Sequence, residues 1–246
     1  MKLLIVSLVS LSLVISSAWA QVSIINDQQY INEGTFHIVG EIENNTLVPL
    51  SQIVITATFY DIHDKILDTV NTDSILKTIM PGKKGPFDLI LTNKMIPQIY
   101  RYSLNIEYKP VDPKTESLEI LSSNAKRDML DNFIISGTIT NHVQKTANTI
   151  VIIATLYDKD GKVVAISKSY SEPDYLKSGG IRPFVVSVID KSQSQKAVDY
   201  SLTAESEEYT AVPEFPLGFG IILSLSVLTY VVLTKRPNNL QQPIFV

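Results

Sequence analysis

Side chains that commonly carry chemistry are sparse in this chain, which has three histidines and no cysteine. The histidines, His37, His63 and His142, lie far apart in sequence and match no zinc spacing such as His-Glu-x-x-His. The sequence also contains no Gly-x-Ser-x-Gly motif, no P-loop and no Rossmann glycine pattern. We therefore predict no catalytic residue, no cofactor-binding residue and no metal ligand, and we expect that the protein is not an enzyme.

One acidic stretch, Asp158-Lys159-Asp160-Gly161, is similar to the start of a calcium loop. An EF-hand needs glycine at its sixth position and an acid at its twelfth, whereas here glycine is fourth and Ser169 is twelfth. The stretch is more typical of a hairpin turn, in which aspartate caps the turn and glycine adopts positive φ. Calcium binding by the pair Asp158 and Asp160, or by Asp61 and Asp64, stays an open alternative.

The segments that contain these acidic residues occur twice in the sequence. Ala57-Thr58-Phe59-Tyr60-Asp61 returns as Ala154-Thr155-Leu156-Tyr157-Asp158, a spacing of 97 residues (154 − 57 = 97). Pro86-Phe87 returns as Pro183-Phe184 at the same spacing. The matched positions are suited to cores and turns rather than to catalysis, so the repeat predicts one folding module in two copies.

Each copy has the alternation of apolar and polar residues that is typical of β-strands. One predicted strand of the first copy places Ile53, Ile55, Ala57 and Phe59 on its inward face. Turn signals recur every 8–12 residues or so, which favours a β-sandwich. We therefore predict an all-β protein with two tandem β-sandwich domains. Gly40 and Gly137 fall on inward faces, where a neighbouring side chain or strand is expected to approach closely.

Residues 1–20 are predicted to be a secretory signal peptide. Lys2 precedes an apolar run, and Ala18 and Ala20 form a small-x-small cleavage site, so the mature chain is expected to begin at Gln21. An uncleaved anchor helix is the alternative.

A second apolar segment, residues 217–234, is predicted to be a transmembrane helix. Its uncharged part is long enough to cross a bilayer, and it ends at Lys235 and Arg236, which should remain in the cytoplasm. Residues 235–246 would then be a cytoplasmic tail, and residues 21–212 would lie outside the cell. A buried core helix is the alternative for this segment.

The predicted boundaries between these ends follow composition. Residues 21–108 and 117–204 are the two β-sandwich domains, and residues 109–116, which contain two prolines, are the linker. Residues 205–216 form an acidic, proline-containing stalk. The formal net charge of −4 and the scarcity of lysine clusters give no sign of a nucleic-acid partner.

Asn44 begins an Asn-Asn-Thr sequon that follows a predicted strand. In an exported chain this position is expected to be exposed, and N-glycosylation at Asn44 is a candidate modification. A plain turn, which asparagine also favours, is the alternative.

The paired Ala-Thr-Phe-Tyr-Asp and Ala-Thr-Leu-Tyr-Asp strands, each followed by an Asp/Gly-Lys turn, resemble FxLYD-type modules. The resemblance covers most of residues 30–108 and 127–206 and implies immunoglobulin-like β-sandwiches, common in prokaryotic surface proteins. It implies little about function, and the first copy departs from the pattern because it has Asp64 in place of the turn glycine.

The C-terminal region resembles the Pro-Glu-Phe (PEF-CTERM-like) sorting signal of archaeal exported proteins. The residues that carry the resemblance are Pro213, Glu214, Phe215 and Pro216, followed by the apolar segment and then Lys235 and Arg236. It implies a membrane transpeptidase, an archaeosortase, as a partner that removes the tail and attaches the chain to the envelope. An ordinary single-pass anchor is the alternative.

These expectations combine into an exported, membrane- or envelope-anchored surface protein that acts in structure or in interaction with other envelope proteins. The alternative is an extracytoplasmic accessory subunit that presents a ligand or metal to a membrane complex.

Overall fold

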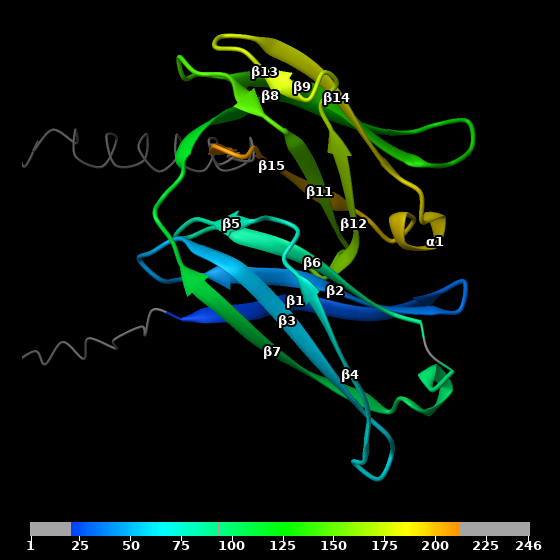
Figure 1. The fold of residues 1–246 in the computed structure, drawn as a ribbon. Helices are drawn as coiled ribbons and strands as arrows, with labels where there is room; N and C mark the ends of the chain where they lie inside the picture. Colours follow the sequence, from blue (N-terminus) through cyan, green and yellow to red (C-terminus); the bar gives the residue numbers. More distant parts are fainter. Residues whose placement is uncertain (1–20, 93, 212–246) are drawn as a thin grey trace, which may run out of the picture.

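A computed structural model describes residues 21–92 and 94–211, which fold into two β-sandwich units connected by a short linker (Figure 1). The strands of the first repeat are β1 (Val22–Asn32), β2 (Thr35–Asn44), β3 (Leu50–Tyr60), β4 (Ile66–Asp73), β5 (Thr78–Ile79), β6 (Lys84–Leu91) and β7 (Arg101–Pro110), with a 3-10 helix, η1 (Ile96–Gln98), before β7. The second repeat contains β8 (Thr115–Arg127), β9 (Phe133–Asn141), β10 (Ala147–Asn148), β11 (Val151–Tyr157), β12 (Val163–Tyr170), β13 (Tyr175–Leu176), β14 (Ile181–Val188), α1 (Lys191–Ser194), β15 (Asp199–Glu205) and β16 (Tyr209–Ala211). The all-β class and the sandwich architecture expected from the repeat are confirmed.

The two repeats share a strand arrangement and differ at one edge. In the first repeat, a sheet in the order β1-β2-β6 faces a sheet in which β3 pairs with β4, β5 and β7. In the second repeat, the corresponding sheets join into one, in the order β12-β11-β15-β16-β8-β9-β14. They join because β16 pairs with β15 on one side and runs parallel to β8 on the other.

Alternation along the strands builds a core in each repeat. In β3, the predicted inward residues Ile53, Ile55, Ala57 and Phe59 are at most 3% exposed, and the residues between them are half-buried. Burial of such side chains contributes roughly 1.5–3 kcal/mol each. Because the chain contains no cysteine, the described domains are held by this burial and by main-chain pairing.

The two predicted inward glycines lie directly under phenylalanine rings. Gly40 pairs with Phe87 across β2 and β6, and a Cβ atom on Gly40 would lie 2.9 Å from that ring. Gly137 pairs with Phe184 across β9 and β14, and a Cβ atom there would lie 2.7 Å from the ring and 2.1 Å from the carbonyl oxygen of Ser122. The close approach expected at these glycines is confirmed, and it accounts for the repetition of both glycine and phenylalanine.

The aspartate turns also match between the repeats. Asp158 Oδ1 accepts hydrogen bonds from the main-chain N–H groups of Asp160 and Lys162, each at 2.9 Å, and Gly161 has φ of 76°. In the first repeat, Asp61 forms the same turn, and Asp64 adopts φ of 61° in the glycine position. The hairpin interpretation of these acidic residues is therefore confirmed. Main-chain hydrogen bonds, that from Lys65 foremost, hold the pKa of Asp61 below its usual value.

Two predicted boundaries shift. The linker expected at residues 109–116 is shorter, because β7 extends to Pro110 and β8 begins at Thr115. The stalk expected from residue 205 is wrong over residues 205–211, because Glu205 ends β15 and β16 adds a further strand.

The signal peptide and the segment 217–234 lie outside the described residues. Within residues 21–92 and 94–211, the structure contains no helix long and apolar enough to span a membrane.

Candidate functional site: the junction between the repeats

The repeats meet where the hairpin of β11 and β12 lies against the β1-β2-β6 sheet of the first repeat (Figure 1). Ile153, in the centre of β11, is 0% exposed and belongs to the core of the first repeat rather than to that of its own. Val151 and Ile166 pack against the same core. Because β11 has apolar side chains on both faces, it contributes to two cores at once.

The same positions are polar in the copy that lacks this contact. Thr56 and Thr69 of the first repeat correspond to Ile153 and Ile166, and they are half-buried and exposed, respectively. On the opposing sheet, Val39 is fully buried, whereas its counterpart in the second repeat is the half-buried Ser136. The two repeats therefore differ at the positions through which they touch.

A buried glutamate on each side of the junction binds a group from across it. Glu41 of β2 is 2% exposed; its Oε1 accepts a hydrogen bond of 2.6 Å from the Tyr157 hydroxyl, and its Oε2 accepts one of 3.1 Å from the Asn26 amide. Burial raises the pKa of Tyr157 far above its ordinary value, and the neighbouring Glu41 carboxylate raises it further. At neutral pH, Tyr157 is therefore a hydrogen-bond donor to Glu41.

The second buried glutamate, Glu205, comes from β15 and is also 2% exposed. Its Oε2 accepts a 2.7 Å hydrogen bond from the main-chain N–H of Lys77, and its Oε1 accepts one of 2.9 Å from Lys114 Nζ. Lys77 belongs to the first repeat and Lys114 to the linker, so this carboxylate joins three parts of the chain. Its positional counterpart in the first repeat, Glu107, is exposed. Buried carboxylates need such partners, because an unpaired charge in the interior is costly.

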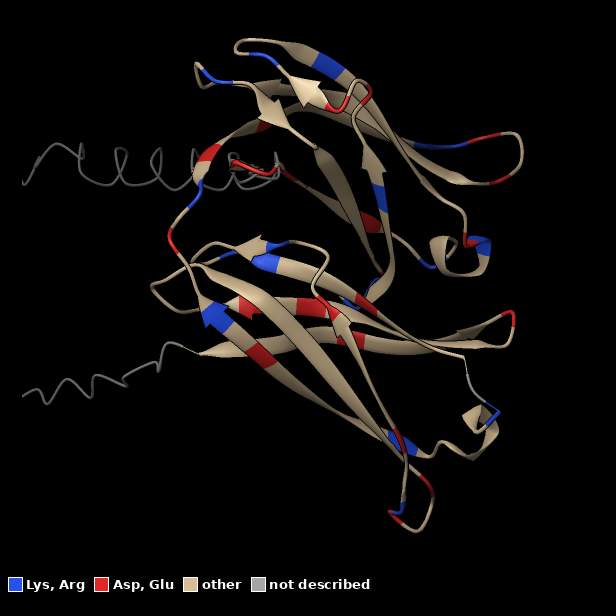
Figure 2. Ribbon diagram, viewed as in Figure 1, with Lys and Arg blue, Asp and Glu red and all other residues tan. Residues whose placement is uncertain are grey.

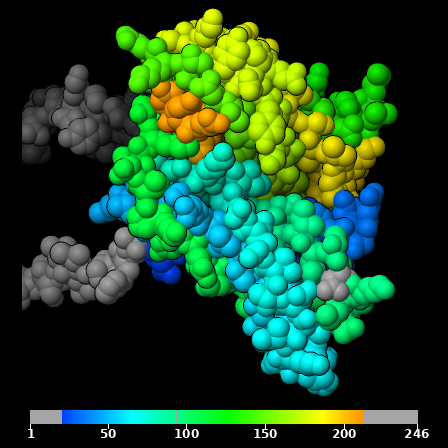
Figure 3. Space-filling model, viewed as in Figure 1, coloured from blue at the N-terminus to red at the C-terminus, as the bar shows by residue number. Residues whose placement is uncertain are grey.

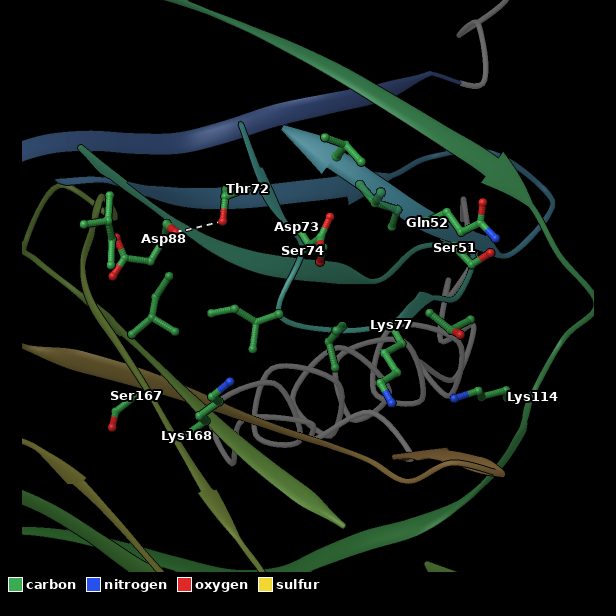
Figure 4. A pocket seen from close by; sticks show the side chains of 17 residues that line it. Ser51, Gln52, Thr72, Asp73, Ser74, Lys77, Asp88, Lys114, Ser167 and Lys168 are labelled. Carbon is green, nitrogen blue, oxygen red and sulfur yellow. Dashed lines mark hydrogen bonds between the residues drawn. The ribbon is translucent and has the colours of Figure 1, made fainter. Parts of the chain in front are cut away.

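A groove of about 1020 Å³ opens beside this contact, between the segment joining β4 to β5 and strand β12 (Figure 4). Its volume is at the upper end of the range of small-molecule sites, roughly 300–1,000 Å³. The polar side chains that line it are Ser51, Gln52, Thr72, Asp73, Ser74, Lys77, Thr78, Asp88, Lys114, Ser167 and Lys168. Hydroxyl groups, three ammonium groups and two carboxylates therefore face one space together with aliphatic side chains.

The groove is balanced in charge rather than anionic or cationic. Lys114 is already paired with Glu205, so Lys77 and Lys168 are the ammonium groups that remain to offset Asp73 and Asp88. Acidic and basic residues are likewise interspersed over both repeats in Figure 2. No group of three or more histidine or acidic residues suited to a metal ion occurs among residues 21–92 and 94–211. This composition suits a neutral or zwitterionic polar ligand better than a metal or a polyanion.

A tyrosine, a histidine and an aspartate form a further cluster beside the groove. His37 Nδ1 lies 3.0 Å from Asp88 Oδ1, and the His37 ring stacks on Tyr30 with centroids 4.7 Å apart. Burial raises the pKa of Asp88, and its contact with His37 opposes that rise. A histidine paired with an aspartate in this way is found in catalytic triads. In the described part of the chain, however, no hydroxyl or thiol nucleophile is hydrogen-bonded to His37. Within residues 21–92 and 94–211, the cluster shows no hydrogen-bonded nucleophile–base pair of the kind that is typical of acyl transfer.

The expected exposure of Asn44 is wrong. Asn44 is 0% exposed, and its Nδ2 atom donates hydrogen bonds of 2.9 Å to the carbonyl oxygens of Val48 and Ile79. Its counterpart 97 residues later, Asn141, is equally buried and makes the same two bonds, to Lys145 and Leu176. The amide nitrogen that a glycan would need is thus occupied in the folded chain. The repetition of this asparagine was the signal, available in the sequence, that its role is structural.

The other predicted residues are dispersed or lie outside the described structure. His63 lies in the β3–β4 turn and His142 pairs with Glu119 at the surface, so the histidines do not converge. The signal-cleavage residues Ala18 and Ala20 and the sorting residues, from Pro213 onward to Arg236, lie outside the described residues; Gln21 is the first described residue. No sequence pattern predicts the buried pair Glu41 and Tyr157, because their contact depends on how the repeats dock.

Comparison with known proteins does not assign the chain to a family. No family model matches it, and no curated protein sequence is similar to it. Among solved structures, the chain is similar to the exo-chitosanase CsxA of Amycolatopsis orientalis, at 11% identity and a TM-score of 0.27, over 79% of this chain and 26% of that one. It is also similar to red sea bream transglutaminase, at 11% identity and a TM-score of 0.24, over 80% of this chain and 31% of that one. A β-glucuronidase of Bacteroides uniformis matches at 13% identity and a TM-score of 0.24, over 72% of this chain and 25% of that one. The chain thus spans about a quarter to a third of these proteins, and TM-scores this low relate it to none of their activities.

Proposed function

We propose that the chain is an exported surface protein, anchored in the membrane or envelope, whose two immunoglobulin-like repeats act as one rigid unit in contact with other envelope proteins. The observation that carries the proposal is the junction, in which Ile153 of the second repeat is fully buried in the core of the first. Interfaces between domains are often small and polar, and the domains then move independently. A junction with a shared core instead suits a module that holds a fixed surface away from its anchor.

The anchor itself is proposed from the sequence. The signal peptide at residues 1–20 would export the chain, and the apolar segment at residues 217–234, followed by Lys235 and Arg236, would hold it in the bilayer. The Pro213-Glu214-Phe215 motif supports processing by an archaeosortase-like transpeptidase. The sequence, which contains no recognised catalytic motif, is the basis for proposing a role without catalysis.

Cell fractionation combined with intact mass tests this proposal. The native protein is expected in the membrane or envelope fraction, and protease added to intact cells is expected to digest residues 21–212. A mature chain that begins at Gln21 and ends near Pro213 with an added mass would indicate transpeptidase processing. A chain that keeps residues 217–246 would indicate a conventional anchor. A soluble cytoplasmic chain would refute the proposal in both forms.

The groove favours a second candidate function, that of an accessory subunit which binds a polar ligand outside the cytoplasm. Its volume and its converging hydroxyl, ammonium and carboxylate groups support this alternative. A ligand of the groove should raise the unfolding temperature of the wild-type chain, and it should do so less in the variant Lys168→Ala. An equal shift in both proteins would place the ligand elsewhere.

A further inference from the structure

We infer that the end of the molecule carrying the linker lies on the membrane, with the loop between β2 and β3 in contact with the lipid surface. The inference rests on the proposed anchor and adds an orientation and a second point of contact. It concerns the apolar residues Leu47 and Val48, which are 90% and 44% exposed.

The short tether limits how far the module can stand from a bilayer. The described structure ends at Ala211, and the apolar segment begins at residue 217, six residues later (217 − 211 = 6). Six extended residues span at most ~20 Å. The part of the module around Ala211 must therefore lie close to the point at which the segment enters the membrane.

That part of the module is the linker end. Ala211 pairs with Leu118, four residues past the linker residue Lys114. The β2–β3 loop lies at the same end, since the main-chain N–H of Val111 donates a 3.0 Å hydrogen bond to the carbonyl oxygen of Pro49. Figure 3 shows the C-terminal strand, the linker and this loop along one side of the molecule. Gln21, where the described chain begins, is also here, because its carbonyl oxygen accepts a hydrogen bond from the N–H of Asn45.

The loop has the chemistry of a membrane-surface contact in this repeat and not in the other. Leu47 and Val48 correspond to Gln144 and Lys145 of the second repeat, so the fold does not require apolar residues at these positions. Asn44, which fixes the base of the loop, is common to both copies as Asn141, so the backbone is held while the tip varies. Apolar side chains at such a tip can enter the headgroup and acyl boundary, and the energy scales with the apolar area that they bury.

Lysines flank the loop on both sides. The main-chain carbonyl of Lys83 accepts a hydrogen bond from the N–H of Asn44, and Lys109 pairs with Ser51 at the start of β3. Glu43 is the nearest acidic side chain on this strand, and Asn45 donates a 2.7 Å hydrogen bond to it. A basic residue close to an anionic lipid surface favours binding to it. Asp112 of the linker is also exposed at this end, so the charge around the loop is mixed and the contact rests on the apolar tip.

Tryptophan fluorescence in vesicles tests the inference on the full chain. The single tryptophan, Trp19, lies in the predicted signal peptide, so the chain from Gln21 onward contains none and an introduced tryptophan is the sole reporter. The test variant is Leu47→Trp. The control is Ile62→Trp, at the exposed β3–β4 turn, on the opposite end of β3 from the loop. Both chains are reconstituted into phosphatidylcholine and phosphatidylglycerol vesicles, with or without bromine on the acyl chains.

We expect the brominated lipid to reduce the emission of the Leu47→Trp chain by at least about twofold and that of the Ile62→Trp chain by little, because quenching needs contact with the acyl chains. If brominated lipid quenched the two variants equally, in vesicles with which the protein floats, the result would overturn the membrane contact and leave the anchor intact. Failure of the wild-type chain to float with vesicles would instead refute the proposed anchor, and the contact with it.

Discussion

Replacement of Ile153 by alanine measures how strongly the two repeats are joined. The side chain is 0% exposed and fills space in the core of the neighbouring repeat. Truncation of a buried isoleucine to alanine costs about 2–5 kcal/mol, since it loses transfer free energy and leaves a cavity. The cavity would lie between two sheets that can close only by moving one repeat, so we expect a loss near the middle of that range, about 3 kcal/mol. This loss is a large share of the free energy of unfolding of a typical domain, which is ~5–15 kcal/mol.

The matched control is Thr56→Ala, at the corresponding position of the first repeat, where the side chain is half-buried and does not belong to the junction. Its expected cost is within ~0.5 kcal/mol. The assay is urea unfolding of the full chain in detergent, followed by far-ultraviolet circular dichroism. The wild-type chain should unfold in one transition, and Ile153→Ala should shift the first repeat to lower urea and separate the transitions. Similar midpoints for the two variants would refute the shared core as the source of rigidity.

Three further outcomes follow from contacts within the repeats. Asn141→Ala removes the donor for two buried carbonyl groups and should lower the free energy of unfolding in urea by about 2–4 kcal/mol. The control Asn45→Ala, at an exposed position, should lower it little. Equal losses of stability would contradict the structural role of Asn141. Gly137→Ala should unfold the second repeat or cost more than about 3 kcal/mol of stability, because the new Cβ atom would lie 2.1 Å from a main-chain oxygen. Gly161→Ala, at φ of 76° in open space, should cost only about 1 kcal/mol. The reverse order in thermal midpoints would refute this account. Burial raises the pKa of Asp88, so the stability it contributes is present below its unfolded value near 4 and is lost as pH rises through the higher folded value. Unfolding free energies across that range should therefore decline more in the wild-type chain than in Asp88→Asn, and parallel curves would show that this carboxyl is not the cause.

Much of the fold could be predicted from the sequence because its signals are local or repeated. The alternation in β3, the inward glycines and the aspartate turns each depend on neighbouring residues, and two copies of each made the pattern visible. The sequon at Asn44 predicts an exposed site only when it is separated from its buried counterpart, Asn141. Its burial follows from hydrogen bonds to residues on other strands, which no local pattern contains.

The junction could not be predicted, because its contacts join residues far apart in the sequence, such as Tyr157 and Glu41, which are 116 positions apart. The alternation of apolar and polar residues places Tyr157 on the outward face of its own sandwich, whereas its hydroxyl reaches Glu41 of the other repeat. The signal that existed was the set of positions at which the copies differ. Isoleucine in one copy and threonine in the other, at an outward strand position, indicates a contact that only one copy makes.

The same differences disfavour continuation of this pairing beyond two repeats. One face of the first repeat meets a different face of the second, and a contact of this heterologous kind can continue into a filament when the remaining faces match. Here the remaining faces carry Thr56 and Thr69 on the first repeat and Ser136 on the second, in place of Ile153, Ile166 and Val39. A second copy that docked in the same way would bury hydroxyl groups where the junction buries hydrocarbon, and buried polar groups without partners are unfavourable. The repeat thus supplies the shape of the interface in both copies, and the side chains confine it to one place.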